Sequence, residues 1–224
     1  MTASRRDFIL LHTRLRPAPA VPELELYQAD EIFPLWRTLD AEVDRLEGVP
    51  PFWAFAWAGG QALARYLLDR PAEVQGKRVL DFAAGSGICA LAAMKAGAAT
   101  VVAVDTDPYS IEVVGLNAEA NALSVTVWQY DLLDEQPLII DVVLAGDVCY
   151  EKPMAARVLP WLRSLHASGV RVLLADPGRA YFPVREFVLL AEYDIPTSRD
   201  LEDEVSKHTG VYTFRSPAAP GTAW

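Results

Sequence analysis

The chain has 224 residues, of which 52% are hydrophobic and 22% are charged, and its 30 acidic residues outnumber its 20 basic ones to give a net charge of −10. This composition supports one large domain, or one domain with an appendage, and excludes a wholly disordered chain. The acidic balance argues against a nucleic-acid partner, because phosphates bind clustered Lys and Arg, and it suits a basic protein surface or a lysine side chain.

The N-terminal residues bear on where the protein resides. Arg5 and Arg6 precede the apolar run FILL, which is too short for a secretory signal, although the arginines up to Arg16 leave a mitochondrial transit peptide open. Cys89 and Cys149 are the two cysteines, a number that fits a reducing compartment. No stretch has the length of a membrane span. We therefore expect a cytoplasmic protein without a membrane partner, with the mitochondrial matrix as the alternative.

The first fifty residues are predicted to form an extension of helical and irregular structure ahead of a main domain over residues 51–224. Within the extension, residues 30–48 are predicted to form a helix, and Pro50 and Pro51 interrupt the chain after it. The main domain begins with an aromatic-rich segment. A helix is predicted next, over residues 60–68, because apolar side chains recur there at helical spacing.

From residue 77 onward, apolar stretches alternate with helical patterns. A strand that is apolar throughout is buried on both faces, and such strands separated by helices indicate a parallel sheet covered on both sides. Strands are predicted over residues 77–82, 100–107, 125–131, 138–147 and 170–176, and helices over residues 86–97, 108–123 and 152–168.

The C-terminal part departs from this pattern. Residues 184–190 are predicted to form a short helix, and residues 191–196 and 210–215 two strands joined by an exposed acidic loop. We therefore expect an α/β fold of Rossmann-like type. Seven mostly parallel strands would carry helices on both faces, and the sheet would end in a C-terminal antiparallel hairpin.

A turn of small residues follows the first predicted strand of this sheet. In open α/β sheets, ligands bind beyond the carboxyl ends of the strands, so the turn lies where a ligand is expected. Gly85 and Gly87 allow positive φ and a close approach of a ligand to the backbone. Asp81 is expected to face a cation, Asp105 to accept hydrogen bonds from ribose hydroxyls, and Asp131 to lie near a base or its amino group.

Two cofactors compete for this turn. Gly85-x-Gly87-x-x-Ala90 fits the dinucleotide fingerprint, which would make the protein a dinucleotide-dependent oxidoreductase. S-adenosylmethionine carries no phosphate but has a sulfonium, an amino group, ribose hydroxyls and an adenine, so it needs acidic partners more than a phosphate cradle. Three successive strands that end in Asp favour S-adenosylmethionine. The alternative is that these aspartates only cap helices and solvate loops.

Several segments carry a resemblance to a known group of enzymes. "VLDFAAGSG", "VVAVDTD" and "WQYDLL" resemble the cofactor-binding motifs of the class I (seven-β-strand) methyltransferases, and the order of elements over residues 77–215 agrees. Asp147-Val-Cys-Tyr150 is similar to the Asp/Glu-x-x-Tyr/Phe motif of the branch that methylates protein lysines. "PFWAFAWAGGQALARYLLD" and "LLADPGRAYF" look like the electron transfer flavoprotein β-subunit lysine methyltransferases and their bacterial relatives.

The resemblance implies S-adenosylmethionine as the cofactor and a protein lysine as the acceptor. The partner it implies is the electron transfer flavoprotein β-subunit or, as for some bacterial relatives, a ribosomal stalk protein. We expect a monomer that acts in the bacterial cytoplasm and has no nucleic-acid partner. The alternatives are a methyltransferase for a small molecule, an RNA base or another protein, and a non-catalytic S-adenosylmethionine-binding module. Asp105, Asp147 and Tyr150 argue against the non-catalytic module.

Chemistry assigns roles to the two residues of the lysine motif. Methyl transfer from a sulfonium is an in-line displacement, so positioning supplies much of the rate. A lysine amine, with a pKa of about 10.4, must lose its proton before it attacks, and a neighbouring carboxylate opposes that loss. We therefore assign Asp147 to capture and orientation of the lysine nitrogen rather than to strong-base catalysis, and Tyr150 to the wall of the lysine channel.

The aromatic segment and the strand ends supply the remaining predicted site residues. Trp53 and Trp57 are expected on one helical face and, with Phe52 and Phe55, to form a lid over the cofactor. Gln61 is expected to bind the cofactor carboxylate. His12, His166 and His208 show no metal-ligand spacing, so no metal is expected. The predicted cofactor-binding residues are Trp57, Gly60, Gln61, Asp81, Ala83, Gly85, Gly87, Asp105, Thr106, Asp131 and Leu132, and the predicted substrate-binding residues are Trp53, Asp176 and Arg179.

Overall fold

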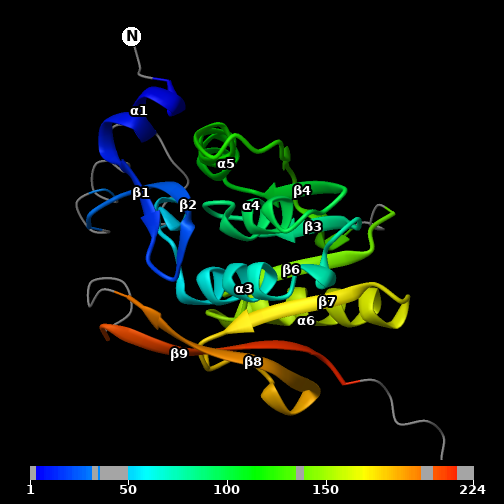
Figure 1. The fold of residues 1–224 in the computed structure, drawn as a ribbon. Coiled ribbons are helices and arrows are strands. Elements are labelled where there is room, and N and C mark those ends of the chain that lie inside the picture. The colour runs from blue at the N-terminus through cyan, green and yellow to red at the C-terminus, as the bar shows by residue number, and fades with distance from the viewer. Residues whose placement is uncertain (1–3, 32–34, 36–49, 135–138, 198–203, 216–224) are drawn as a thin grey trace, which may run out of the picture.

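The fold was obtained as a computed structural model that describes residues 4–31, 35, 50–134, 139–197 and 204–215. A single seven-stranded sheet forms its centre (Figure 1). Its strands are β3 (Arg78–Phe82), β4 (Thr100–Asp105), β5 (Thr126–Gln129), β6 (Val142–Gly146), β7 (Arg171–Asp176), β8 (Phe187–Pro196) and β9 (Ser206–Phe214). They lie in the order β5-β4-β3-β6-β7-β9-β8, with β3 to β7 parallel and β8 and β9 antiparallel, which confirms the predicted fold class.

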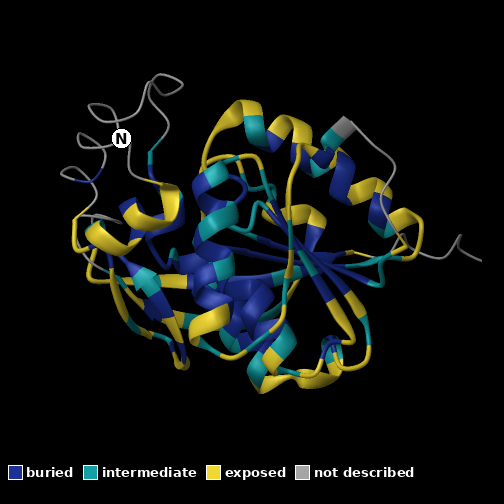
Figure 2. Ribbon diagram, turned by 90° about the horizontal axis from the view of Figure 1, so that it is seen from above, coloured by how far each residue is buried: buried dark blue, intermediate teal, exposed yellow. Residues whose placement is uncertain are grey.

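Helices cover both faces of the sheet, and side chains alternate between the two faces along each strand. On β3, Val79 packs in the cluster formed with α3, α4 and α5, whereas Leu80 and Phe82 pack in the cluster formed with α6. The central strands are therefore buried on both sides, as Figure 2 shows. The covering helices are α3 (Ala58–Asp69), α4 (Ile88–Lys95), α5 (Pro108–Ala120) and α6 (Lys152–Ala167).

The C-terminal hairpin differs from its prediction. The predicted helix over residues 184–190 is wrong, because only Val184–Glu186 form a 3-10 turn and β8 starts at Phe187. Phe187 pairs with Phe214 of β9 and is buried in the sheet's core, so pairing with a distant strand overrides the local helical preference. The second strand begins at Ser206, four residues earlier than predicted, and residues 198–203 of the predicted acidic loop lie outside the described residues.

The N-terminal part packs on the main domain as a helix and a small hairpin. Helix α1 (Arg5–His12) starts at a capping box between Ser4 and Asp7, and β1 (Arg14–Ala18) pairs antiparallel with β2 (Val21–Gln28). Phe8 of α1 contacts Tyr109 of α5 edge to face, with ring centroids 5.6 Å apart. The predicted helix over residues 30–48 falls almost entirely outside the described residues.

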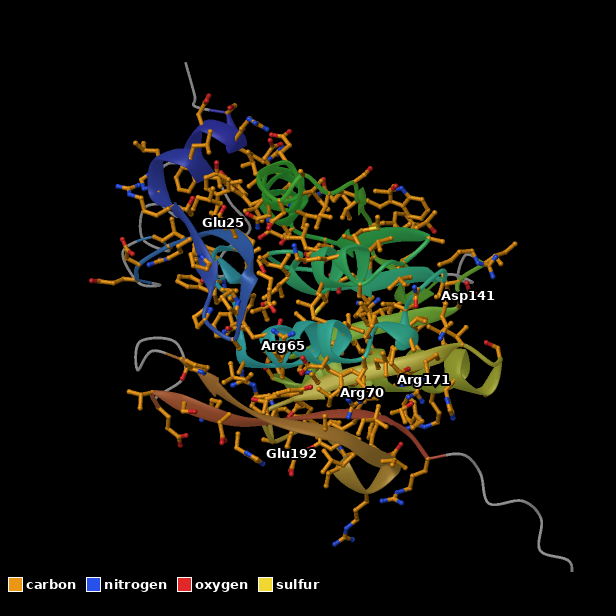
Figure 3. The ribbon with its side chains drawn as sticks, in the orientation of Figure 1. Glu25, Arg65, Arg70, Asp141, Arg171 and Glu192 are labelled. Carbon is orange, nitrogen blue, oxygen red and sulfur yellow. The ribbon has the colours of Figure 1, made fainter. Side chains whose placement is uncertain are left out.

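Ion pairs connect these elements across the surface. Arg65 of α3 pairs with Glu23 of β2 and with Asp69 in its own helix, at 2.8 and 2.9 Å. Figure 3 shows Arg65 on α3 and Arg171 on β7; the latter pairs with Glu73 at 3.1 Å. No described helix is long and apolar enough to cross a membrane.

Candidate active site

A cavity of about 600 Å³ opens at the carboxyl ends of β3, β4 and β6. It is lined by the aromatic segment before α3, the turn after β3, the residues that follow β4, β5 and β6, the start of α6, and Arg179. Its position agrees with the general rule for ligand sites in open α/β sheets, and its volume lies in the usual range for small-molecule sites.

The turn after β3 forms one wall of this cavity. Ala83, Gly85 and Gly87 all have positive φ, at 53°, 53° and 78°. A Cβ on Gly87 would lie 2.8 Å from the side chain of Val114, so this glycine is required for the packing of α5 against α4. A Cβ on Gly85 would meet nothing closer than the Phe52 carbonyl oxygen at 4.0 Å. The backbone at Gly85 therefore faces open space within the cavity.

Asp105 holds this turn in place from the end of β4. Its carboxylate accepts hydrogen bonds from the backbone N–H groups of Gly85, at 2.8 Å, and Asp107, at 2.9 Å. Burial raises its pKa, against the lowering effect of these hydrogen bonds. The carboxylate thus combines a structural role with a place in the cavity wall, next to Thr106.

Asp81 reaches the cavity but its carboxylate is engaged elsewhere. It is 2% exposed and accepts a hydrogen bond from the Ala90 N–H of α4 at 2.9 Å. Burial holds its pKa well above the ordinary value, with a smaller contribution from Asp105. The structure thus gives Asp81 a bond to α4 as well as the place in the cavity wall that was predicted for it.

Asp131 and its neighbours follow β5. Asp131 lines the cavity and pairs with Arg157 of α6 at 3.0 Å. Leu132 points instead into the core beneath α6, and the residue that lines the cavity is Leu133. The sequence pattern identified this segment but not which of the two leucines faces the site.

Asp147 follows β6, the neighbour of β3 in the sheet, and lines the same cavity as the glycine turn. It has a φ of 55°, and its backbone N–H donates to the Ala175 carbonyl of β7 at 3.0 Å. One carboxylate oxygen accepts from the Gly59 N–H at the start of α3, and the other accepts from the Arg179 guanidinium at 2.8 and 3.2 Å. The carboxylate is therefore fixed from two sides.

Two glycines of α3 make this arrangement possible. A Cβ on Gly59 would lie 2.5 Å from the Asp147 carboxylate and 2.7 Å from the Ala175 carbonyl oxygen. Gly60 lines the cavity, and a Cβ there would lie 3.1 Å from Ile88. The backbone at Gly59 thus lies against protein atoms of β6 and β7, where no side chain would fit.

An aromatic wall of Phe52, Phe55, Trp57 and Tyr150 also lines the cavity. The ring of Phe52 contacts Tyr150 at 5.2 Å and Trp57 at 5.6 Å, and the Trp57 indole N–H donates to the Phe52 carbonyl at 2.9 Å. Phe55 packs against Trp57 from the other side, at 6.1 Å. Burial raises the pKa of Tyr150 to about 12, so its hydroxyl stays neutral at physiological pH. Phe52 and Phe55, which the predicted lid includes, both line the cavity.

Besides Gly87 and Leu132, three predicted residues do not line the cavity. Trp53 is fully buried and stacks on Tyr109 at 5.5 Å, so it supports the N-terminal core and not a lid. Gln61 is 1% exposed, accepts from the Ala20 N–H and donates to the Ala56 carbonyl, so it ties the N-terminal hairpin to α3. Asp176 is 1% exposed beneath the cavity.

Asp176 shapes the loop after β7. One carboxylate oxygen accepts from the backbone N–H groups of Gly178 and Arg179, at 2.7 and 2.6 Å, and the other has no hydrogen-bond partner among the described residues. Burial raises the pKa of Asp176 to about 6. The turn directs Arg179 back into the cavity, where it meets Asp147.

The described residues contain no group of three or more His, Cys, Asp or Glu side chains that could hold a metal ion. Among the described residues, the ionisable lining of the cavity is strongly acidic, and the only cationic lining residues are Arg157 and Arg179, each of which pairs with an aspartate. The acidic lining residues are Asp81, Asp105, Asp107, Asp131, Asp147 and Glu151.

Comparison with known sequences finds relatives that are all named as protein methyltransferases. The chain is 36% identical over 215 residues to the electron transfer flavoprotein β-subunit lysine methyltransferase of Xenopus laevis, covering 93% of this chain and 86% of the relative. It is 38% identical to the Mus musculus protein of the same name, covering 73% and 67%. It is 41% identical to the ribosomal protein L11 methyltransferase of Xanthomonas campestris, covering 70% and 54%. The sequence profile of the ribosomal protein L11 methyltransferase family matches residues 61–150.

Comparison with solved structures agrees on the fold. A ribosomal protein L11 methylase from Lactobacillus delbrueckii superposes with a TM-score of 0.51 at 20% identity, covering 73% of this chain and 81% of that one. A putative RNA methyltransferase from Pyrococcus horikoshii superposes with a TM-score of 0.53 at 18% identity, covering 80% and 95%. At these identities the likeness concerns the fold alone.

Proposed function

Since the chain belongs to the family of electron transfer flavoprotein β-subunit lysine methyltransferases, it is an S-adenosylmethionine-dependent protein-lysine N-methyltransferase, and we propose that its substrate is the β-subunit of an electron transfer flavoprotein. The observation that carries the site assignment is the position of Asp147. It lines the same cavity as the glycine turn, together with an aromatic wall that includes Tyr150.

The cavity fits S-adenosylmethionine better than a dinucleotide. A dinucleotide brings a diphosphate, which needs N–H groups and free cations, whereas both lining arginines are paired with aspartates. The acidic lining suits a ligand with a sulfonium and an amino group. The open backbone at Gly85, where no side chain intervenes, gives that ligand room next to the carboxylate of Asp105.

The residues around the turn have separate tasks in holding the cofactor. We assign Asp105 to the ribose hydroxyls, because its carboxylate retains acceptor capacity beyond the two backbone N–H groups it binds. Asp131 and Thr106 lie on the same side of the cavity, which suits contacts to the adenine end. When bound, S-adenosylmethionine supplies a methyl group on a positively charged sulfur, which is the electrophile of the reaction.

Asp147 and the aromatic wall are assigned to the acceptor. A lysine side chain packs its aliphatic stem against rings and carries its nitrogen at the tip, so Phe52, Trp57 and Tyr150 suit its passage. Asp147 then accepts an N–H from the amine and fixes the direction of its lone pair. The rings also keep water away from the reacting atoms, which favours the neutral amine over the ammonium.

Mass spectrometry tests the substrate directly. The purified protein, incubated with S-adenosylmethionine and recombinant electron transfer flavoprotein, is expected to increase the mass of the β-subunit in steps of one methyl group on lysine. Replacing the labelled lysines by Arg should end the labelling, because Arg stays protonated. An unchanged β-subunit together with a labelled ribosomal protein L11 would move the substrate to the one named in the other relatives.

We further propose that the enzyme acts as a monomer on a protein and not on nucleic acid, in the bacterial cytoplasm. The net charge of −10 supports a non-nucleic-acid substrate, because it repels phosphates. Light scattering of the purified protein tests the monomer. Labelling of total RNA would contradict the substrate class, and fractionation of the host cells tests the compartment.

A further inference from the structure

The Arg179 side chain lies inside the cavity and contacts the carboxylate that is assigned to the lysine. Its Nη2 and Nε atoms lie 2.8 and 3.2 Å from one oxygen of Asp147. Both side chains are largely withdrawn from solvent, at 24% and 11% exposure. A charge pair with so little solvent is screened weakly, so it matters more than a surface ion pair.

The chain builds this contact in a defined way. Asp176 binds the backbone N–H groups of Gly178 and Arg179, and Gly178 has a φ of 86°. The resulting turn reverses the chain directly after β7. Since β6 and β7 are neighbours and the Asp147 N–H binds the Ala175 carbonyl, the reversal brings Arg179 over the end of β6, beside Asp147.

The contact between Arg179 and Asp147 affects the protonation state of the substrate lysine. An isolated carboxylate stabilises the ammonium form of the substrate lysine, and that form has no lone pair with which to attack. Arg179 cancels the charge of Asp147, and the Gly59 N–H occupies the other oxygen. Three N–H groups then use most of the acceptor capacity of the carboxylate and leave room for about one more N–H. A single remaining acceptor position can bind one N–H of a neutral amine and so orient it.

The other titratable groups near the pair do not replace Arg179. Burial raises the pKa of Cys149 to about 12, and it holds the pKa of Cys89 well above its ordinary value, so both thiols are neutral. Asp176 lies behind Arg179 and is itself anionic above a pKa of about 6. Among the residues that the structure describes, the remaining ionisable lining residues are Asp81, Asp105, Asp107, Tyr130, Asp131, Tyr150, Glu151 and Arg157.

We infer that Arg179 is a positioning residue that neutralises Asp147 and so lowers the pKa of the bound substrate lysine. The inference rests on the lysine methyltransferase function of the same site. The substrate ammonium gives its proton to water as it enters. The nitrogen lone pair then forms the N–C bond while the C–S bond breaks and its electron pair goes to sulfur. The positive charge passes from sulfur to the methylated nitrogen.

The test is the pH profile of kcat at saturating substrate, because this profile reports the pKa values of the enzyme–substrate complex. Arg179→Met and Arg179→Gln remove the charge, and Arg179→Lys keeps it. For the two neutral variants we expect the acidic limb of the kcat profile to move up by about one pH unit. At neutral pH kcat should then be about tenfold lower than in the wild type, and at alkaline pH it should return to the wild-type value. KM should fall, because the unpaired carboxylate captures the ammonium. Arg179→Lys should keep the wild-type profile.

A matched control separates this effect from loss of an ion pair in general. Arg163 of α6 pairs with Glu186 at 2.6 Å on the exposed surface, so Arg163→Met should leave the profile unchanged. Neutral variants that lose activity by one factor at every pH, or that keep the wild-type profile, would overturn the inference. Failure of the proposed substrate has a different signature, since the wild-type enzyme would then not label the flavoprotein. In that case the profile is measured on the protein that it does label.

Discussion

The side-chain amide of Asn117 donates a hydrogen bond to the Ser86 carbonyl across 2.8 Å and so connects α5 to the glycine turn. Its oxygen accepts from the Tyr27 N–H of β2 at 2.8 Å, and the side chain is fully buried. One amide therefore joins the N-terminal hairpin to the backbone that faces the cofactor site. One turn later, Asn121 binds both backbone groups of Glu25 without touching the glycine turn; Figure 3 shows Glu25 on the hairpin.

The two asparagines allow the hairpin and the glycine turn to be tested separately. Asn117→Ala should weaken S-adenosylmethionine binding, because the Ser86 carbonyl loses its donor and the turn loses its support. It should also lower the free energy of unfolding by about 1–3 kcal/mol, the cost of buried groups without partners. Asn121→Ala should destabilise the hairpin yet leave the affinity near wild type. Calorimetric titration and denaturant unfolding measure both quantities, and equal affinities for the two variants would exclude this coupling.

Gly59→Ala should disrupt the site from α3. The added methyl would lie 2.5 Å from the Asp147 carboxylate and 2.7 Å from the Ala175 carbonyl oxygen, so the helix must move away from β6. Overpacking of this kind costs about 1–3 kcal/mol, and the shift should reduce kcat strongly. Gly115→Ala in α5 is the control. Its Cβ meets nothing within 4 Å, so it should raise stability by up to about 1 kcal/mol. Equal kcat and equal free energies of unfolding for the two variants would contradict the proposed packing of Gly59 against Asp147.

Asp147→Ala should abolish lysine methylation while cofactor binding survives. The carboxylate is assigned to the acceptor nitrogen, and its loss also removes the ion pair between Asp147 and Arg179. Loss of positioning can cost on the order of a hundredfold or more in rate. A radiolabel assay measures the transfer and calorimetry the cofactor affinity. Full activity in the variant would remove Asp147 from the acceptor site.

Asp176 should make stability depend on pH. Burial raises its pKa from 3.8 in the unfolded chain to about 6 in the fold, so the folded state favours the protonated form. The resulting stabilisation is present below pH 3.8 and is lost as the pH rises through about 6. Asp176→Asn keeps an oxygen for the Gly178 and Arg179 N–H groups but removes the charge. Compared with wild type, it should gain up to about 2 kcal/mol between pH 4 and pH 8 in denaturant unfolding. A difference in the free energy of unfolding that stays the same at every pH would show that Asp176 does not cause the pH dependence.

Much of the site was predictable because parallel strands end at a common edge. Asp105 ends a mainly apolar strand and Gly85 and Asp147 follow two others, and these three neighbouring strands bring their ends to one cavity. The structure places all three in the wall of that cavity, as the pattern predicted. The sequence could not distinguish the roles of Leu132 and Leu133. The short irregular segment after β5 has no fixed periodicity that shows which side chain turns inward.

Other features depend on contacts between residues far apart in the chain. Trp53 and Trp57 are four residues apart, but Trp53 ends in the N-terminal core because Tyr109 of α5 provides a ring on which it stacks. Gln61 serves the hairpin at Ala20, which lies 41 residues earlier. A local pattern shows neither partner, so the prediction wrongly placed Trp53 and Gln61 at the cavity.

The alternation of strands and helices, the glycine turn and the aspartates at strand ends can be predicted from the sequence alone, because hydrophobic period and backbone freedom are local properties. The partners of those residues follow only from the folded arrangement. Phe187 became part of a strand because Phe214 lies opposite it, and Arg179 turned inward because the Asp176 turn and the register of β6 against β7 direct it to Asp147. Long-range pairing and burial set these contacts, and neither can be read from the spacing of residues along the chain.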